Sequence, residues 1–152
     1  MECNMESIKG GVTAAKGFCA AGLNAGIKNN EKKDMAMVYS EKPCVTAGTF
    51  TTNKVFAAPV KWDKDIVANS PFAQAVVVNS GVANACTGKE GDGRVRGTEA
   101  KAVSEALQIP ESAVLVASTG VIGAQLPMDK ICAGIKELPK KLGSSLDHGT
   151  LA

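Results

Sequence analysis

The sequence is poor in aromatic residues, in histidine and in long apolar runs. Aromatic side chains make up 4% of its 152 residues, and His148 is the single histidine. So few aromatic residues argue against a stacking platform for nucleic acid, and one histidine leaves a structural zinc site short of ligands. No run approaches the ~20 apolar residues that cross a bilayer. The acidic N-terminal segment Met1–Glu6 is also unlike a secretory leader. We therefore expect no bound metal and no nucleic-acid or membrane partner.

Neither sign of charge dominates, and the cysteines follow no disulfide pattern. Lys and Arg total 17 against 15 for Asp and Glu, which gives a net charge of +2. This balance predicts no electrostatic footprint for nucleic acid. The five cysteines are odd in number, widely spread and without a Cys-x-x-Cys pair. Such usage is typical of a reduced protein, so we expect a cytoplasmic location.

Hydrophobic residues make up 45% of the chain, and their order indicates packed layers. Continuous apolar runs at 75–78 and 113–117 predict buried strands. One-face apolar spacing predicts helices over 98–107, with Thr98 as N-cap, and from Pro127 to Pro139. The other segments are predicted to be a hairpin of 35–40 and 44–50, an extended piece at 55–60, an exposed loop at 87–97 and an irregular tail at 143–152. Together these elements predict one α/β domain over 1–152, a layered sandwich of mixed β-sheet and helices.

Three familiar binding or catalytic patterns fail on inspection. A phosphate-binding loop ending at Gly88-Lys89 would need glycine and serine or threonine where Ala83 and Glu90 stand. Cys86 follows a strand exit, but no basic partner is near it in sequence, so it is expected to be a buried, inert thiol. Glu90 and Asp92 are expected to face solvent rather than to act as paired acid and base.

The clearest chemical signal is Ser118-Thr119-Gly120, between a buried strand and a helix. A turn there exposes backbone N–H groups, glycine admits a close substrate, and Thr119 adds a hydroxyl donor, as an oxyanion hole requires. A plain Thr-Gly turn explains the same residues. The segment Asn79–Gly88 is similar in kind, because its small and amide side chains could line a polar pocket or satisfy backbone groups in a tight connection.

Four segments in order carry a family resemblance. They read VTAAKGF at 12–18, AAPV at 57–60, NSGVANACTG at 79–88 and STGVIG at 118–123. Together they resemble the N-terminal part of the ornithine acetyltransferase (glutamate N-acetyltransferase, ArgJ-type) family of arginine biosynthesis, over nearly all of residues 10–140. Position 82 departs from the pattern, since it is valine where a second asparagine is expected.

The resemblance implies an acetyl transfer from N-acetylornithine to glutamate, and some family members also use acetyl-CoA. No bound cofactor is implied. The family's precursor cleaves itself before a threonine, which becomes the nucleophile and forms an acetyl-threonine intermediate. The α and β chains of one precursor then assemble into a hetero-oligomer with a layered α/β sandwich fold. The Thr-Gly pair of the family's oxyanion hole matches Thr119 and Gly120.

The C-terminal end departs from the family pattern. The chain stops at Leu151-Ala152, before the family's Thr-Thr-Asp, Lys-Gly-x-Gly-Met and Ala-Thr segments, and Thr150 does not fit the nucleophile's motif. We therefore expect an α-chain fragment that is incomplete at its C-terminus and has no nucleophile. A small-ligand binding module and an inactive truncated fragment are the alternative interpretations.

The expected outcome for the isolated 152-residue chain is no acetyl transfer from N-acetylornithine to glutamate, because an oxyanion hole without a nucleophile cannot react. A transfer assay measures this directly, and clear turnover by the isolated chain would contradict it. Calorimetry with N-acetylornithine identifies a binding module, whose signature is binding without turnover. A broad thermal transition would identify a poorly folded fragment.

Overall fold

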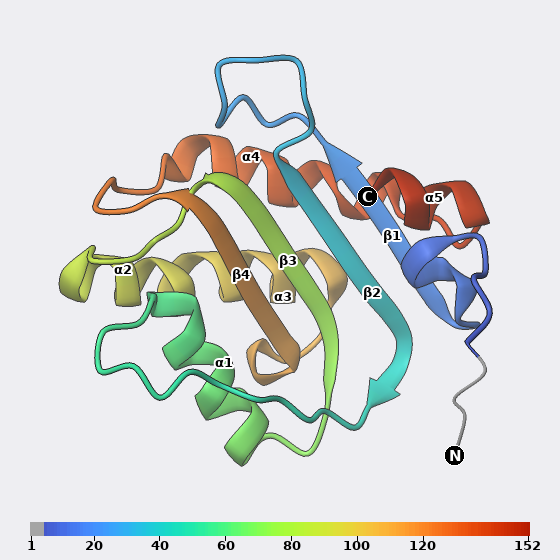
Figure 1. The fold of residues 1–152 in the computed structure, drawn as a ribbon, viewed down its shortest axis with the longest axis horizontal. Helices are drawn as coiled ribbons and strands as arrows, with labels where there is room; N and C mark the ends of the chain where they lie inside the picture. Colours follow the sequence, from blue (N-terminus) through green and yellow to red (C-terminus); the bar gives the residue numbers. More distant parts are fainter. Residues whose placement is uncertain (1–4) are drawn as a thin grey trace.

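The computed structural model describes residues 5–152, so Cys3 and most of the acidic N-terminal segment lie outside it. It contains a four-stranded mixed sheet with helices around it, which confirms the predicted α/β class (Figure 1). The strands are β1 (Phe18–Leu23), β2 (Met35–Cys44), β3 (Ala73–Val82) and β4 (Val114–Val121). The helices are α1 (Ala58–Asn69), α2 (Gly88–Arg94), α3 (Lys101–Leu107), α4 (Met128–Glu137) and α5 (Leu146–Leu151). A π-helical segment, η2 (Val95–Ala100), joins α2 to α3, and the short 3₁₀ helices are η1 (Gly11–Ala14), η3 (Glu111–Ala113) and η4 (Pro139–Lys141).

The strands lie in the order β1-β2-β3-β4, and only the last pair is parallel. Parallel neighbours need a long crossover, which is usually helical. Here α2, η2 and α3 form that crossover between β3 and β4. As a result, the carboxyl ends of β3 and β4 meet at one edge of the sheet.

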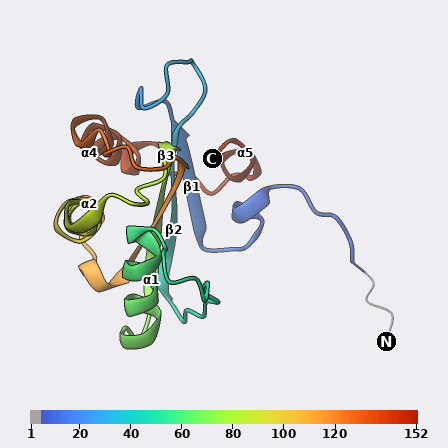
Figure 2. The ribbon, with the colours of Figure 1, turned by 60° about the vertical axis from the view of Figure 1, so that its left-hand side comes forward.

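The main core lies between one face of the sheet and the helices α3 and α4 (Figure 2). Alternate residues of β3 and β4, among them Val77 and Val116, point to this layer, as the two-residue period of a strand requires. Val103 of α3 and Ile131 of α4 meet them and are fully buried, on the helix faces that the apolar spacing predicted. Helix α5 lies on the other side of the sheet, against β1.

Helix α1 covers the outer edge of β4. The Trp62 indole N–H donates to the Val114 carbonyl at 2.9 Å, and an Asp63 carboxylate oxygen accepts from the Val116 N–H at 2.9 Å. These side chains replace a neighbouring strand on the open edge. Burial raises the pKa of Asp63 to about 6, although the hydrogen bond from Val116 acts in the opposite direction.

The C-terminal segment is attached to the opposite edge. The backbones of Ala20 and Gly143 exchange hydrogen bonds of 2.9 and 3.2 Å. The Thr13 hydroxyl of η1 donates to the Ser145 carbonyl at 2.8 Å and accepts from the Gly149 N–H at 3.1 Å. The prediction of an irregular tail is therefore wrong. The segment forms α5, which the hydrogen bonds of Thr13 hold against η1.

Two predictions for the first half of the chain are wrong. Residues 35–44 form the single strand β2, whose hairpin partner is β1, while residues 45–50 form no strand. Pro43 is tolerated because it lies where the pairing of β2 with β3 shifts register, between Tyr39 and Cys44. A proline there interrupts no regular ladder of hydrogen bonds. The expected extended piece at 55–60 instead contains the start of α1, where Pro59 occupies the first turn, a position that needs no N–H.

The predicted loop at 87–97 is also wrong, because this segment is helical. Its helix is stabilised by contacts outside the local sequence, including a hydrogen bond of 2.8 Å from Arg94 to the Leu126 carbonyl. Arg94 also pairs with Glu90 one turn earlier. Thr98 consequently lies inside η2 and is not an N-cap. The strands expected at 75–78 and 113–117 are present within β3 and, from Val114, β4.

The loop between β1 and β2 is held by one buried carboxylate. Asp34 is 2% exposed and accepts hydrogen bonds from the backbone N–H groups of Ala25, Ile27 and Lys28 at 2.7, 2.6 and 3.0 Å. The Asp34 carbonyl also accepts from the Ser80 N–H at 2.8 Å. Asp34 therefore joins this loop to the carboxyl end of β3.

Replacing Asp34 by alanine is expected to lower the free energy of unfolding by about 1.5–3 kcal/mol, because backbone donors lose a charged acceptor. Urea unfolding followed by circular dichroism measures the change. The matched control is Glu31→Ala in the same loop, whose side chain is exposed. Equal stabilities for the two variants would show that Asp34 does not hold the loop.

Candidate active site

The two most specific motif segments lie side by side at the carboxyl ends of β3 and β4. In the parallel register, Ser80 is opposite Thr119 and Gly81 is opposite Gly120. The paired segments reach solvent, since Thr119 and Gly120 are both exposed. The structure therefore brings the predicted oxyanion-hole residues together with the Asn79–Gly88 segment.

Thr119 and Gly120 belong to a strand, which corrects the predicted turn. Strand β4 continues to Val121 because the following backbone stays paired with β3 and its extension, including a bond of 2.9 Å from the Ala83 N–H to the Val121 carbonyl. Side chains alternate along a strand, so Thr119 lies on the face opposite to Ser118 and to the buried Val116. Its hydroxyl is thus directed away from the α3–α4 layer.

Gly120 approaches the backbone of Gly81 too closely for any side chain. A Cβ atom at Gly120 would overlap the carbonyl group of Gly81 and lie 2.6 Å from the Val82 nitrogen. Gly120 also has φ of +133°, a conformation that side-chain-bearing residues rarely adopt. Both constraints require glycine at this position.

The connection after β3 is fixed by Asn84. This buried residue has φ of +48°, its side-chain oxygen accepts from the Thr87 hydroxyl at 2.8 Å, and its amide donates to the Gly91 carbonyl at 3.2 Å. Its own carbonyl accepts from the Ala58 N–H at 3.1 Å. Asn84 therefore satisfies backbone groups and joins α1 to α2, and residues of the same segment also line a cavity, so both interpretations left open for this segment find support.

The cysteine and carboxylate predictions have different outcomes. Cys86 is exposed, so the prediction of a buried thiol is wrong there, and Cys19, Cys44 and Cys132 are partly buried. Glu90 and Asp92 face solvent as predicted, since their side chains are 60% and 41% exposed. Within residues 5–152, no group of three or more histidine, cysteine or acidic residues is arranged to hold a metal ion.

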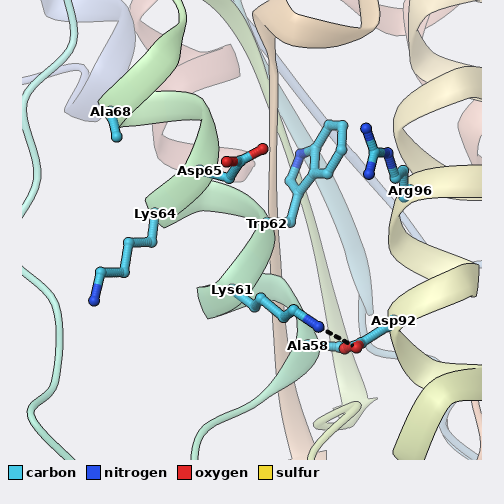
Figure 3. Close-up of a pocket in the computed structure, with 8 residues that line it drawn as sticks. All are labelled: Ala58, Lys61, Trp62, Lys64, Asp65, Ala68, Asp92 and Arg96. Carbon is cyan, nitrogen blue, oxygen red and sulfur yellow. Dashed lines mark hydrogen bonds and ion pairs between the residues drawn. The ribbon is translucent and has the colours of Figure 1, made fainter.

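One cavity near the β4 edge, of about 350 Å³, is lined by residues from the segment before α1 and from the connection after β3, among them Phe56, Asn84 and Thr87. Another, of about 550 Å³, lies between α1 and the α2–η2 helix (Figure 3). In it Lys61 pairs with Asp92 at 2.6 Å and the Arg96 guanidinium lies 5.9 Å from the centre of the Trp62 ring. Neither cavity is lined by Thr119 or Gly120.

Sequence reasoning missed two buried carboxylates, Asp34 and Glu99, and a half-buried one, Asp63. Asp34 and Asp63 accept backbone hydrogen bonds, as described above, whereas one oxygen of Glu99 has no hydrogen-bond partner among the described residues. Burial raises the pKa of Glu99 to about 7. Glu99 lies four residues from both Val95 and Val103, which places it on an apolar helix face. This spacing was the one sequence signal of its burial.

Comparisons with known proteins place the chain in a family. A family model described as the ArgJ family matches residues 19–151. The arginine biosynthesis bifunctional protein ArgJ of Thermotoga neapolitana is 50% identical over 128 residues, which are 84% of this chain and 32% of that protein. The protein of the same name from Caldanaerobacter subterraneus is 50% identical over 151 residues, which are 97% of this chain and 37% of that protein.

Solved structures agree with the sequence comparison. The crystal structure of arginine biosynthesis bifunctional protein ArgJ from Bacillus halodurans has a TM-score of 0.85 at 44% identity, over 92% of this chain and 71% of that chain. Ornithine acetyltransferase from Mycobacterium tuberculosis, in complex with ornithine, has a TM-score of 0.89 at 42% identity, over 93% and 76%.

Fold and site define an α/β protein whose parallel strand pair ends in small polar residues and glycines. The chain belongs to the ArgJ family. It spans about a third of the length of the curated relatives it matches, 32% and 37% in the two described here. None of the helices within residues 5–152 is long and apolar enough to cross a membrane.

Replacing Gly120 by alanine is expected to lower the free energy of unfolding by about 2–4 kcal/mol, because it adds both an overlap and backbone strain. Gly123→Ala is the matched control, since Gly123 has φ of +82° but open space around it, and a loss of about 1 kcal/mol is expected there. Denaturant unfolding compares the two variants. Equal losses would mean that the contact with Gly81 does not constrain the strand ends.

Proposed function

We propose that this chain provides the oxyanion hole of an acetyltransferase that moves an acetyl group from N-acetylornithine to glutamate in arginine biosynthesis. The observation that carries the proposal is the pair Thr119 and Gly120, exposed at the carboxyl end of β4 beside Gly81. The names of the relatives support the pathway, and the solved ornithine acetyltransferase with bound ornithine supports the substrate class.

The backbone of β4 offers a second donor beside the Thr119 hydroxyl. Val114 and Val116 direct their bonded carbonyl and N–H groups to the outer edge, toward α1. Alternate residues of a strand direct their backbone groups to the same side, so the Gly120 N–H is expected on this edge as well. This N–H group lies beyond Val114 and Val116, the residues whose backbone groups are bonded by Trp62 and Asp63. A hydroxyl and an N–H would thus reach one substrate oxygen from neighbouring residues.

The reaction that these donors would serve has two acyl-transfer steps. A threonine of the β chain, which is the partner expected from the same precursor, attacks the acetyl carbonyl of N-acetylornithine through its hydroxyl oxygen. The carbonyl oxygen takes the negative charge, which Thr119 and Gly120 stabilise. The C–N bond then breaks as the threonine hydroxyl proton is transferred to the departing nitrogen, which releases ornithine and leaves the acetyl-threonine ester.

The second step reverses the first with a different amine. The amine of glutamate attacks the acetyl-threonine ester, the same donors stabilise the second oxyanion, and the C–O bond breaks to restore the threonine hydroxyl. Acetyl-CoA could replace N-acetylornithine as the acetyl donor in this scheme, with its thiol as the leaving group. No bound cofactor is needed in either case, and the chemistry is consistent with a cytoplasmic enzyme.

In the full-length protein, Thr119→Ala is expected to lower kcat by about 10²–10³-fold, the usual cost of one oxyanion donor. The KM for N-acetylornithine should change little, because the interaction is made in the transition state. Steady-state transfer assays with N-acetylornithine and glutamate measure both constants.

Two variants act as controls for this prediction. Thr119→Ser keeps the hydroxyl and should retain most of the activity. Thr150→Ala removes an exposed hydroxyl on α5, which lies against β1 at the opposite edge of the sheet from β4, and should leave kcat unchanged. Near-normal turnover by Thr119→Ala would rule out this role for the Thr119 hydroxyl.

A further inference from the structure

Three buried side-chain atoms share an unusual property. Among the described residues, Asn79 Oδ1, Glu99 Oε2 and Ser118 Oγ are shielded from solvent and have no hydrogen-bond partner. Leaving a buried polar atom unpaired is costly, so native proteins pair such atoms with protein groups or with ordered water. All three atoms belong to the part of the fold that carries the candidate active site.

Two of the atoms come from neighbouring positions of the sheet. Asn79 and Ser118 are opposite each other in the parallel register of β3 and β4. By the alternation that buries Val77 and Val116, both side chains face the α3–α4 layer. The Asn79 amide nitrogen donates to the Val82 carbonyl at 2.9 Å, which leaves its oxygen to be satisfied from elsewhere.

The third atom comes from the helix layer that covers this face. Glu99 is 2% exposed, and its neighbours at a spacing of four, Val95 and Val103, are 1% and 0% exposed. The segment that carries it, η2, contacts β4 and α4. This segment is π-helical, a conformation that is rare and concentrated at functional sites. Glu99 is therefore a carboxyl group on the buried face of a locally widened helix.

The titratable and charged groups around Glu99 come from the elements packed against η2. On α4, burial raises the pKa of the Cys132 thiol, and the nearby Glu99 carboxyl group raises it further, whereas β4 carries no titratable side chain. The charged residues of the packed elements are all partly or fully exposed: Lys61, Asp63, Lys64 and Asp65 of α1, Lys89, Glu90, Asp92 and Arg94 of α2, Arg96 of η2, Lys101 and Glu105 of α3, and Asp129, Lys130, Lys136 and Glu137 of α4. Because burial raises the pKa of Glu99 to about 7, the group can donate or accept a proton near neutral pH.

We propose that Glu99, Asn79 and Ser118 form an internal polar site that holds ordered water between the sheet and η2, and that Glu99 is a positioning residue for the adjacent Thr119–Gly120 segment. Water fits this set because the Asn79 oxygen can only accept, whereas the hydroxyl and the carboxyl group can both donate and accept. The connection to Thr119 is covalent, through Ser118. The positioning role rests on the proposed function, whereas the water site does not.

The water site is tested by titrating the ¹³C-labelled Glu99 carboxyl group by NMR in the 152-residue chain. Ser118→Ala removes the hydroxyl that would hold the shared water against the carboxylate, so the carboxylate loses a donor and the proton affinity of Glu99 is expected to rise about tenfold. Ser118→Thr keeps the hydroxyl and should retain the original titration, as should Ser144→Ala, a control at an exposed serine. Amide spectra show whether each variant is folded.

A titration of Glu99 that is unchanged by Ser118→Ala in a folded chain would overturn the shared site. A crystal structure at high resolution gives an independent reading. It should show water within hydrogen-bond distance of at least two of the three atoms. Direct bonds among the side chains, an ion in place of water, or a dry gap would each overturn the proposal.

The positioning role is tested in the full-length protein with Glu99→Gln. This variant keeps the shape of the side chain but cannot ionise, so kcat is expected to fall about tenfold and to lose any inflection near pH 7, while the KM for N-acetylornithine stays unchanged. Glu105→Gln, at an exposed position of α3, is the control. An unaltered kcat and pH profile in Glu99→Gln would overturn the role.

The activity assay and the NMR titration distinguish a failure of the proposed function from a failure of the water site. If the unmodified full-length protein transfers no acetyl group, the proposed function fails and the positioning role fails with it. The NMR titration needs no activity and still decides whether Glu99 and Ser118 share one polar site.

Discussion

The contact between the backbones of Gly81 and Gly120 is the constraint on which the candidate site depends. At the carboxyl ends of β3 and β4 these glycines approach more closely than any side chain would allow. The pairing of β3 and β4 therefore continues to Val121 and ends beside the Asn84 connection. Thr119 consequently lies on a regular, well-paired strand, and its position is fixed by the sheet. A site built on a strand holds its groups more precisely than one built on a loop.

Secondary structure could be predicted from the sequence where burial follows a simple period. The strands at 75–78 and 113–117 are short apolar runs, and the helix ending near Pro139 has a clear apolar face, so local patterns were sufficient. Glycines and charges over 87–97 indicated a loop, yet this segment is helical from Gly88 onward. Its helix depends on Arg94 reaching Leu126 and on Asn84 binding the Gly91 carbonyl. Contacts between residues far apart in sequence or across a turn have no signature in local periodicity.

The same distinction applies to the functional groups. Thr119 and Gly120 could be found because a family motif and a strand exit coincide there. Asp34 and Asp63 could not, because a lone acidic residue in the sequence carries no sign of its burial, and for Glu99 the one signal was its spacing of four from Val95 and Val103. Burial is decided by which element covers the residue: the turn of backbone N–H groups around Asp34, the β4 edge beside Asp63, and the sheet beneath Glu99. The most unusual electrostatic environments of the fold are thus tertiary properties.

The side chains of α1 on the edge of β4 also bear on how the protein avoids self-association. An open strand edge is a template on which a second chain can add a strand and begin an aggregate. Trp62 and Asp63 occupy the Val114 carbonyl and the Val116 N–H, the groups that such a strand would use. Templated growth is thereby blocked along the first half of β4, while the half that contains Thr119 and Gly120 stays accessible. One helix thus limits amyloid-like pairing without covering the residues proposed to bind substrate.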